Sequence, residues 1–426
     1  MNSPLHDGSG RAAFLLASLA LACVAAACGD DAAATPDAGS PAASTCADDC
    51  DNCVEPGDDD QSAVQTALVE VEDGETICLG KGTFHFDAQL DIAANDITLR
   101  GVGMDDTTLD FAKQDVGGNA IAVTGNDTVL EGFTVHESGG DGIRATDVDG
   151  FTVRDVAVLW DESVAENPGY GIYPVGSSRV LVEKSKVCCA SDTGIYVGQS
   201  TQILVRDNEV YDNVAGIEIE NSMDSEVVGN HAHDNAGGIL TFNLPELPVQ
   251  GGRRANIHDN LIEHNNHVNF ASESNIVSAV PPGTGILILA TDENEIHDNE
   301  IRENETTGVL LITYTEGVLG AYDDPTFDAF SEGNWIHDNT FTDNGNKPQG
   351  LVSALFGGMK GPDIGWDGCF ADKADATDAD KRNCISGNGD ASFLNVNFAL
   401  CGGSGKPSTD ADLATCEHDS LPAIDL

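Results

Sequence analysis

The sequence predicts an all-β protein in which short single strands wind into stacked coils, a parallel β-solenoid. Two repeated patterns carry this prediction, and no long helical periodicity competes with them. In the first pattern a glycine precedes alternating apolar residues, and it begins at Gly142, Gly171, Gly194, Gly216, Gly238, Gly285 and Gly308. The second pattern places apolar residues around Asp-Asn and occupies residues 203–210 and 255–262, with looser copies at 226–232, 295–301 and 335–341.

The spacing and alternation of these patterns explain how the coils would be built. The glycines recur in steps of 29, 23, 22, 22, 47 and 23 residues, and a coil of this length holds two or three strands joined by tight turns. In the segment 216–220 the period of two points Ile217 and Ile219 inward, and Glu218 and Glu220 outward. A leucine-rich repeat would need a regular leucine frame, and a propeller would need a period about twice as long.

One asparagine recurs at the same phase of successive repeats. Because asparagine tolerates the left-handed turn conformation, and because stacked amides hydrogen-bond to one another, we expect these residues to form a structural ladder. Its members are Asn208, Asn230, Asn260, Asn299 and Asn339.

The coils resemble the right-handed parallel β-helix repeats of the pectate-lyase-like superfamily. The segment 61–68 is similar to the helix that caps the N-terminal end of such proteins, and 74–79 with 82–84 is similar to a first coil. Four runs, 170–175, 194–199, 216–221 and 281–285, resemble a group of exported bacterial β-helix lipoproteins of no established activity. The resemblance covers about residues 61–344 and implies a right-handed helix, in a superfamily that holds lyases, epimerases, hydrolases and non-enzymes.

The N-terminus is expected to direct export. Arg11 precedes an apolar run over residues 12–27, which is too short for a confident transmembrane helix, and the segment 24–28 resembles a bacterial lipobox. Cys28 would then be lipidated, and the lipid would be the only membrane contact. Plain secretion with cleavage nearby is the alternative. We therefore expect an envelope lipoprotein, in the periplasm or at the cell surface.

Four segments follow from these features. Residues 1–28 form the signal peptide and lipobox, and residues 29–45, rich in Ala, Asp, Pro, Gly and Ser, form a flexible tether. Residues 46–344 form the β-helix, with a capping helix near 61–71. Residues 345–426 form a last coil and a cysteine-rich cap.

The cysteines predict disulfides at both ends of the solenoid. Ten follow Cys28, and an even number in an exported protein indicates disulfide pairs. They are Cys46, Cys50, Cys53, Cys78, Cys188, Cys189, Cys369, Cys384, Cys401 and Cys416. A metal site at the Cys50–Cys53 CxxC pair is the alternative.

The charge excludes one class of function. Lys and Arg total 19 against 72 Asp and Glu, a net charge of −53, so a basic patch for nucleic acid is not expected. Such a surface attracts cations, and Ca²⁺ is the one cofactor the composition suggests, although no EF-hand frame is present. The loop 322–325 is a candidate contributor to a calcium site. We expect a monomer.

Alignment of the glycine pattern predicts columns of outward side chains. The first column is Arg144, Tyr173, Tyr196, Glu218, Leu240, Leu287 and Leu310, and the second is Thr146, Val175, Gly198, Glu220, Phe242, Leu289 and Ile312. The C-terminal half of both columns is apolar and should be covered. The covering segments should be the insertions 243–254, 265–283 and 314–333.

We place the candidate site where this cover should end. The candidate catalytic residues are Tyr196, Glu218 and Glu220, because neighbouring carboxylates raise each other's pKa and a tyrosine can donate a proton. The candidate substrate-binding residues are Arg144, Tyr173, Gln199 and Asn221. An ordinary polar solenoid face is the alternative interpretation.

Three functions are compatible with this sequence. The first is an envelope-anchored protein that binds a polysaccharide and modifies it in the manner of a lyase or epimerase. The second is a non-catalytic structural or protein-binding solenoid, with an envelope protein docked on the apolar half-face. The third is a metal-handling periplasmic protein that uses the stacked His258, His297 and His337, or the pair His231 and His233.

Overall fold

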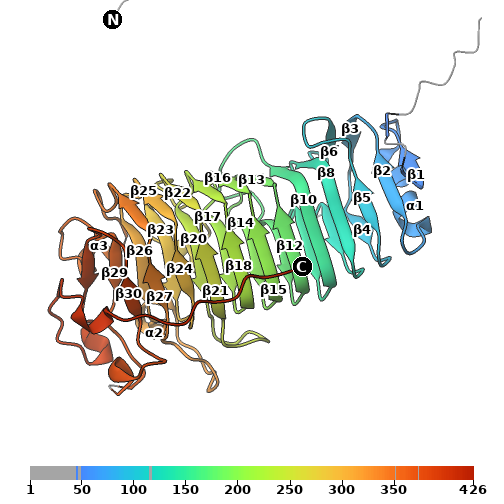
Figure 1. Ribbon diagram of the computed structural model, residues 1–426. Helices are drawn as coiled ribbons and strands as arrows, with labels where there is room; N and C mark the ends of the chain where they lie inside the picture. The colour runs from blue at the N-terminus through green and yellow to red at the C-terminus, as the bar shows by residue number, and fades with distance from the viewer. Residues whose placement is uncertain (1–44, 47–48, 115–117, 351, 373) are drawn as a thin grey trace, which may run out of the picture. The chain divides into compact units, whose positions relative to one another are not determined.

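The structure, a computed structural model, describes residues 45–46, 49–114, 118–350, 352–372 and 374–426 (Figure 1). It is a right-handed parallel β-helix in which every pairing between named strands is parallel. Each regular coil contributes one strand to each of three faces. The predicted signal peptide, Cys28 and the tether up to residue 44 lie outside the described residues.

The first face is the 11-stranded sheet. Its strands are β4 (Leu90–Ile92), β7 (Ile121–Val123), β9 (Ile143–Thr146), β11 (Tyr170–Val175), β14 (Thr193–Gly198), β17 (Ala215–Glu220), β20 (Gly237–Phe242), β23 (Thr284–Leu289), β26 (Thr307–Ile312), β29 (Ile364–Trp366) and β31 (Phe393–Asn395).

The second and third faces belong to one 20-stranded sheet, because the long strands β8 (Thr128–His136) and β10 (Asp149–Leu159) take part in both. The other strands of the second face are β1 (Asn52–Val54), β2 (Thr76–Leu79), β5 (Thr98–Arg100), β12 (Ser178–Glu183), β15 (Thr201–Arg206), β18 (Met223–Val228), β21 (Arg253–His258), β24 (Glu295–His297), β27 (Trp335–His337) and β30 (Cys384–Ser386). Those of the third face are β3 (Gly82–His85), β6 (Thr107–Asp110), β13 (Lys186–Cys188), β16 (Glu209–Tyr211), β19 (His231–His233), β22 (Leu261–Glu263), β25 (Glu300–Arg302) and β28 (Thr340–Thr342).

The interior is filled by residues that stack from coil to coil. Ile195, Ile217, Ile239 and Ile286 are register partners in successive strands of the first face, and all four are fully buried. Burial of each such side chain contributes about 1.5–3 kcal/mol. The repeated glycine has a steric reason, because a Cβ at Gly216 would lie 2.6 Å from a backbone oxygen of the next coil.

A helix caps the N-terminal end of the solenoid, as the sequence predicts. Helix α1 (Asp60–Glu70) covers the N-terminal end and buries Val64 and Leu68. The remaining helices are short: α2 (Glu316–Leu319), α3 (Val352–Leu355), and the 3-10 helices η1 (Ile276–Ala279), η2 (Asp375–Thr377), η3 (Ala399–Cys401) and η4 (Asp412–Ala414). None of the helices in the described part of the chain is long and apolar enough to cross a membrane.

All ten cysteines after Cys28 are paired in disulfides. The pairs are Cys46–Cys53, Cys50–Cys78, Cys188–Cys189, Cys369–Cys401 and Cys384–Cys416. Two pairs hold the N-terminal end and two the C-terminal region, so disulfides rather than a metal account for the CxxC pair. The middle pair joins adjacent residues.

The asparagine ladder is present, but its members do not occupy the left-handed position. Asn230 Nδ2 donates to Asn260 Oδ1 at 3.0 Å, and the series continues through Asn299 and Asn339 to Asn388. The left-handed residue is the one just before each asparagine, such as Asp259 with a φ of 53°. The role of the asparagine is therefore that of its buried side-chain amide, which hydrogen-bonds to backbone groups of two coils.

A second ladder runs along the other turn of each coil and is not predicted by the sequence analysis. It links Asn213, Asn235, Asn265, Asn304 and Asn344. Asn304 and Asn344 each follow an acidic residue, Glu303 and Asp343, so a search for a second recurring acidic-Asn pair in each repeat would have found this ladder.

Candidate functional site

The predicted columns on the first face are confirmed by the strand register. Arg144 pairs with Tyr173, Tyr196 with Glu218, and Glu218 with Leu240. The second column follows in the same way, with Gly198 opposite Glu220. The face therefore changes from polar and aromatic to apolar between β17 and β20.

The apolar half of the face is covered by the predicted insertions. Leu240, Leu287, Leu310, Phe242 and Leu289 are buried, and they form a second core with residues of 265–283, 314–333 and 345–360. A cavity of about 270 Å³ remains beneath the cover, and its lining includes Val280, Leu319, Leu355 and Phe398. The hypothesis that an envelope protein docks on this half-face is therefore wrong, because loops of the same chain cover it.

Three carboxylates lie at the boundary between the two halves. Asp192, Glu218 and Glu220 are 3%, 1% and 7% exposed, so the two glutamates of the outward columns are covered by neighbouring side chains rather than open to solvent. None of the three forms an ion pair with a Lys, Arg or His of the described residues. Burial without a cationic partner is costly for an ionised carboxylate.

Hydrogen bonds hold the three carboxylates in place. Thr193 Oγ1 donates to Glu218 Oε2 at 2.8 Å, and the Tyr196 hydroxyl donates to Glu220 Oε1 at 2.5 Å. Asn275 Nδ2 donates to Asp192 Oδ2 at 2.9 Å, which brings the insertion 265–283 onto the edge of the cluster. We call Asp192, Glu218, Glu220 and Tyr196 the acid cluster.

Burial shifts the proton equilibria of this cluster. Desolvation raises the pKa of Asp192 to about 6 and that of Glu220 to about 7. It also raises the pKa of Glu218 well above its ordinary value, and the nearby charge of Glu220 adds to the effect. Both glutamates are thus easier to protonate than exposed ones, and a pKa of about 7 poises Glu220 to exchange a proton near neutral pH.

Half-buried aromatic side chains border the acid cluster, and Tyr170, Tyr173 and Arg144 form this rim. The ring centroids of Tyr170, Tyr173 and Tyr196 lie 4.4–4.9 Å from one another, and the Arg144 guanidinium lies 4.8 Å from the centroid of Tyr173. Arg144, Tyr170 and Tyr173 are half-buried, whereas Tyr196 is only 4% exposed. Gly198 makes room for Tyr196, because a Cβ there would lie 2.4 Å from the tyrosine hydroxyl.

Two predicted binding residues do not belong to the cluster. The Asn221 amide donates to the carbonyls of Leu244 and Val249 and accepts from Leu244 N–H, so it anchors the insertion 243–254. Its side chain is fully buried and cannot contact a substrate. Gln199 lies in the turn after β14 with a φ of 51°, and its contact with the cluster is a backbone one, in which its N–H donates to the Glu220 carbonyl at 2.9 Å.

Asp192, Tyr170 and Asn275 are the site residues that the sequence analysis missed. Tyr170 immediately precedes Gly171 and Asp192 lies two positions before Gly194, so extension of the outward columns beyond the glycine would have found them. No repeat signal marks Asn275, which lies in a non-periodic insertion.

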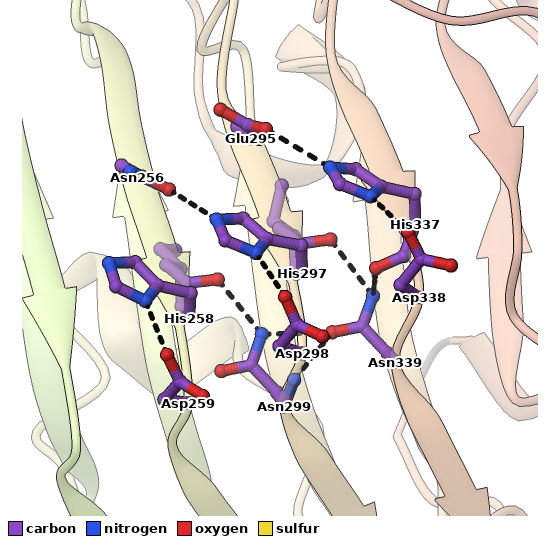
Figure 2. A network of polar contacts seen from close by, with 12 residues as sticks. Asn256, His258, Asp259, Glu295, His297, Asp298, Asn299, His337, Asp338 and Asn339 are labelled. Carbon is purple, nitrogen blue, oxygen red and sulfur yellow. Dashed lines mark hydrogen bonds and ion pairs between the residues drawn. The ribbon is translucent and has the colours of Figure 1, made fainter. Parts of the chain in front are cut away.

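The stacked histidines are structural and do not present free ligand atoms. In each, Nδ1 lies 2.8–2.9 Å from the carboxylate of the next residue, and Figure 2 shows this for His258, His297 and His337. The Nε2 atoms of the three rings contact Glu226, Asn256 and Glu295 respectively. With both nitrogens of each ring engaged, this column is a poor metal site.

The candidate calcium loop is also occupied by its own contacts. Asp324 accepts hydrogen bonds from Thr326 N–H and hydroxyl and from Glu246 N–H. The loop contributes to none of the groups of potential metal-ligand atoms in the described chain.

Comparison with known proteins agrees with the architecture. Residues 100–246 match the family described as "Right handed beta helix region". The A-module of a mannuronan C-5 epimerase from Azotobacter vinelandii has a similar structure, with a TM-score of 0.54 at 15% sequence identity, over 78% of this chain and 91% of that chain. Tailspike protein 2 of the Escherichia coli O157:H7 bacteriophage CAB120 gives 0.50 at 14% identity, over 82% of this chain and 44% of that chain.

No curated protein matches the sequence itself. At these identities the structural likeness concerns the fold alone. Together with the strand topology and the family match over residues 100–246, it supports the right-handed parallel β-helix fold of this chain.

Proposed function

We propose that this protein binds a polysaccharide on its first face and exchanges protons with it, in the manner of a lyase or an epimerase. The observation that carries the proposal is the acid cluster, which has no cationic partner among the described residues and lies next to the half-buried Tyr170 and Tyr173, with Arg144 over the Tyr173 ring. Buried titratable groups with shifted pKa values are characteristic of functional sites.

The rim supplies the contacts that a sugar chain needs. Tyr170 and Tyr173 offer ring faces for the apolar side of a pyranose, and Arg144 offers a cation for a uronate carboxylate. A lyase and an epimerase both remove the proton next to that carboxylate. The lyase then expels the glycosyl oxygen, and the epimerase returns a proton to the opposite face of the carbon. The superfamily fold, shared with an enzyme named for mannuronan, makes a polysaccharide the first class to test.

Glu220 is the group best suited to the proton exchange. A pKa of about 7 allows it both to accept and to donate near neutral pH. Its hydrogen bond from Tyr196 connects it to the rim, because the Tyr196 ring contacts the half-buried rings of Tyr170 and Tyr173.

A panel of acidic and neutral polysaccharides tests this proposal on protein freed of residues 1–28, with and without Ca²⁺. Ultraviolet absorbance reports unsaturated products, proton exchange with deuterated water reports epimerisation, and depletion from solution reports binding. We expect Arg144→Ala to weaken binding, and Glu220→Gln and Tyr196→Phe to abolish turnover while binding is kept. Glu300→Gln, at an exposed site on the third face, is the matched control. A panel without binding to any glycan would reject the proposal.

A second candidate function is polysaccharide binding without turnover. It is favoured by the burial of Glu218, Glu220 and Tyr196, and by the hydrogen bonds that Thr193 donates to Glu218 and Tyr196 donates to Glu220. In that case Tyr173→Ala and Arg144→Ala weaken binding, no product forms, and Glu220→Gln leaves the affinity unchanged.

We also propose export to the bacterial envelope, with a lipid on Cys28. Five disulfides in the described residues support an oxidising compartment, where such bonds persist. Fractionation of cells that express the full chain tests this proposal. We expect the protein in the membrane fraction, and release of a Cys28→Ala variant into the soluble fraction.

A further inference from the structure

The third face carries two histidines from one strand and glutamates from both neighbouring strands. His231 and His233 flank the inward-pointing Ala232 in β19, so both rings lie on the outer side of the face. Glu209 in β16 is the register partner of His231, and Glu263 in β22 is the register partner of His233. The two imidazole centroids lie 4.1 Å apart, so the side chains converge.

One ring nitrogen of His233 makes no hydrogen bond to the described residues. Its Nε2 atom is buried and has no hydrogen-bond partner among the described residues. An oxygen of Glu209 lies 3.6 Å from it, which is too long for a hydrogen bond. Two ligands at 2.0–2.2 Å from a tetrahedral zinc ion are separated by about 3.4 Å. The separation of these two atoms thus suits a shared metal ion better than it suits a hydrogen bond.

His231 completes a group of three ligands. One ligand atom from each of Glu209, His231 and His233 lies within 4.8 Å of the other two, a spacing that small side-chain rotations would bring to coordination distance. His231 Nε2 is now 2.9 Å from Glu263 Oε1, so Glu263 stands beside the group as a further oxygen donor.

Neighbouring residues already orient the ligands. Asp234 Oδ2 lies 2.8 Å from His233 Nδ1, which directs Nε2 toward Glu209, as carboxylates do behind metal-bound histidines. Lys186 Nζ lies 2.8 Å from Glu209 Oε2 and leaves Oε1 for the ion. The stacked His258, His297 and His337 differ, because both nitrogens of each ring have partners.

We propose that Glu209, His231 and His233 bind a divalent transition-metal ion, with zinc the ion that two imidazoles and one carboxylate fit best. Three protein ligands leave a fourth position for water or for Glu263. The site uses no residue of the acid cluster and lies on a different face, so it is independent of the proposed polysaccharide function.

Titration of the metal-free full chain with Zn²⁺ and Co²⁺ tests this inference. We expect one ion per chain by calorimetry and the visible absorption bands of tetrahedral Co²⁺. His233→Gln should abolish both, and Asp234→Asn should weaken binding about 10–100-fold. His297→Gln, which alters the structural stack, is the matched control and should bind normally.

Thermal unfolding separates a missing site from a misfolded variant. Zn²⁺ should raise the melting temperature of the parent protein and of His297→Gln, but not that of His233→Gln, whose circular dichroism should match the parent. The inference is overturned if no stoichiometric ion binds, or if His233→Gln binds as well as the parent. Equal losses in His233→Gln and His297→Gln would also overturn it.

Discussion

The backbone N–H of Ile424 donates a hydrogen bond at 2.6 Å to Glu226, which lies 198 positions earlier in the chain. Leu421 N–H makes the same contact with Glu295. The other oxygen of each glutamate faces a histidine of the stack, His258 and His337 respectively. In Figure 1 the final segment runs back from the C-terminal end across the second face. We call residues 417–426 the strap.

Removal of the strap should destabilise the C-terminal coils. Truncation after Asp419 leaves two buried carboxylates without their backbone donors, and hydrogen bonds to charged groups contribute about 1.5–3 kcal/mol each. We expect a lower free energy of unfolding and faster hydrogen exchange in β21, β24 and β27. Truncation after Ile424 keeps both donors and should have little effect. Equal stability of the two truncated chains would contradict the role of these hydrogen bonds.

The disulfide Cys384–Cys416 should anchor the strap. It closes a segment with a sequence separation of 32, and loops of this length give about 3–4 kcal/mol of stabilisation when cross-linked. The double variant Cys384→Ser with Cys416→Ser should unfold at a lower denaturant concentration. The loss should appear in β27 and β30 by hydrogen exchange while β2 and β5 keep their protection. A uniform loss along the solenoid would argue against a local anchor.

The asparagine ladder should contribute strongly to stability. Asn260 is 1% exposed, and its amide donates to the carbonyls of Val227 and His258 and to Asn299. Asn260→Ala leaves several buried backbone groups unpaired, so we expect a loss of about 2–4 kcal/mol in chemical denaturation. Asn346→Ala, at an exposed loop position, is the control and should change stability by less than about 0.5 kcal/mol. A similar small change for Asn260→Ala would show that the ladder is dispensable.

The acid cluster should make stability fall as pH rises. Burial raises the pKa of Glu220 from 4.5 to about 7, so between these values the folded state binds more protons than the unfolded state. The favourable contribution is complete below about pH 4.5 and is lost as the pH passes 7. Glu220→Gln removes this titrating group. From pH 5 to 8 the free energy of unfolding of the variant should fall by about 1–3 kcal/mol less than that of the parent protein. Parallel pH profiles for the two proteins would exclude Glu220 as the titrating group.

The coil architecture could be predicted because its determinants lie within one repeat. Ile217 and Glu218 alternate along a strand, and the glycine pattern places Glu218 beside Tyr196 of the preceding coil. The apolar column with Leu240 and Leu287 also predicts its own cover, since exposed apolar side chains of that number are unfavourable in water.

The surroundings of the candidate site could not be read from the same pattern. An outward position suggests solvent exposure for Glu218 and Glu220, yet neighbouring side chains bury both, and Asn275 closes the edge of the cluster from a segment 83 residues beyond Asp192. The strap contact with Glu226 is equally remote in sequence.

The sequence by itself thus determined the solenoid, its register, its capped ends and the residues on each outward column. These depend on backbone periodicity, on steric limits at glycine and on the pairing of buried amides, all of which act between adjacent coils. Only the tertiary structure decided which outward residues are buried, which carboxylates have raised pKa values and where the strap lies. The physical reason is that non-periodic segments bring distant residues together, and the dielectric environment of a side chain depends on those contacts rather than on its place in the repeat.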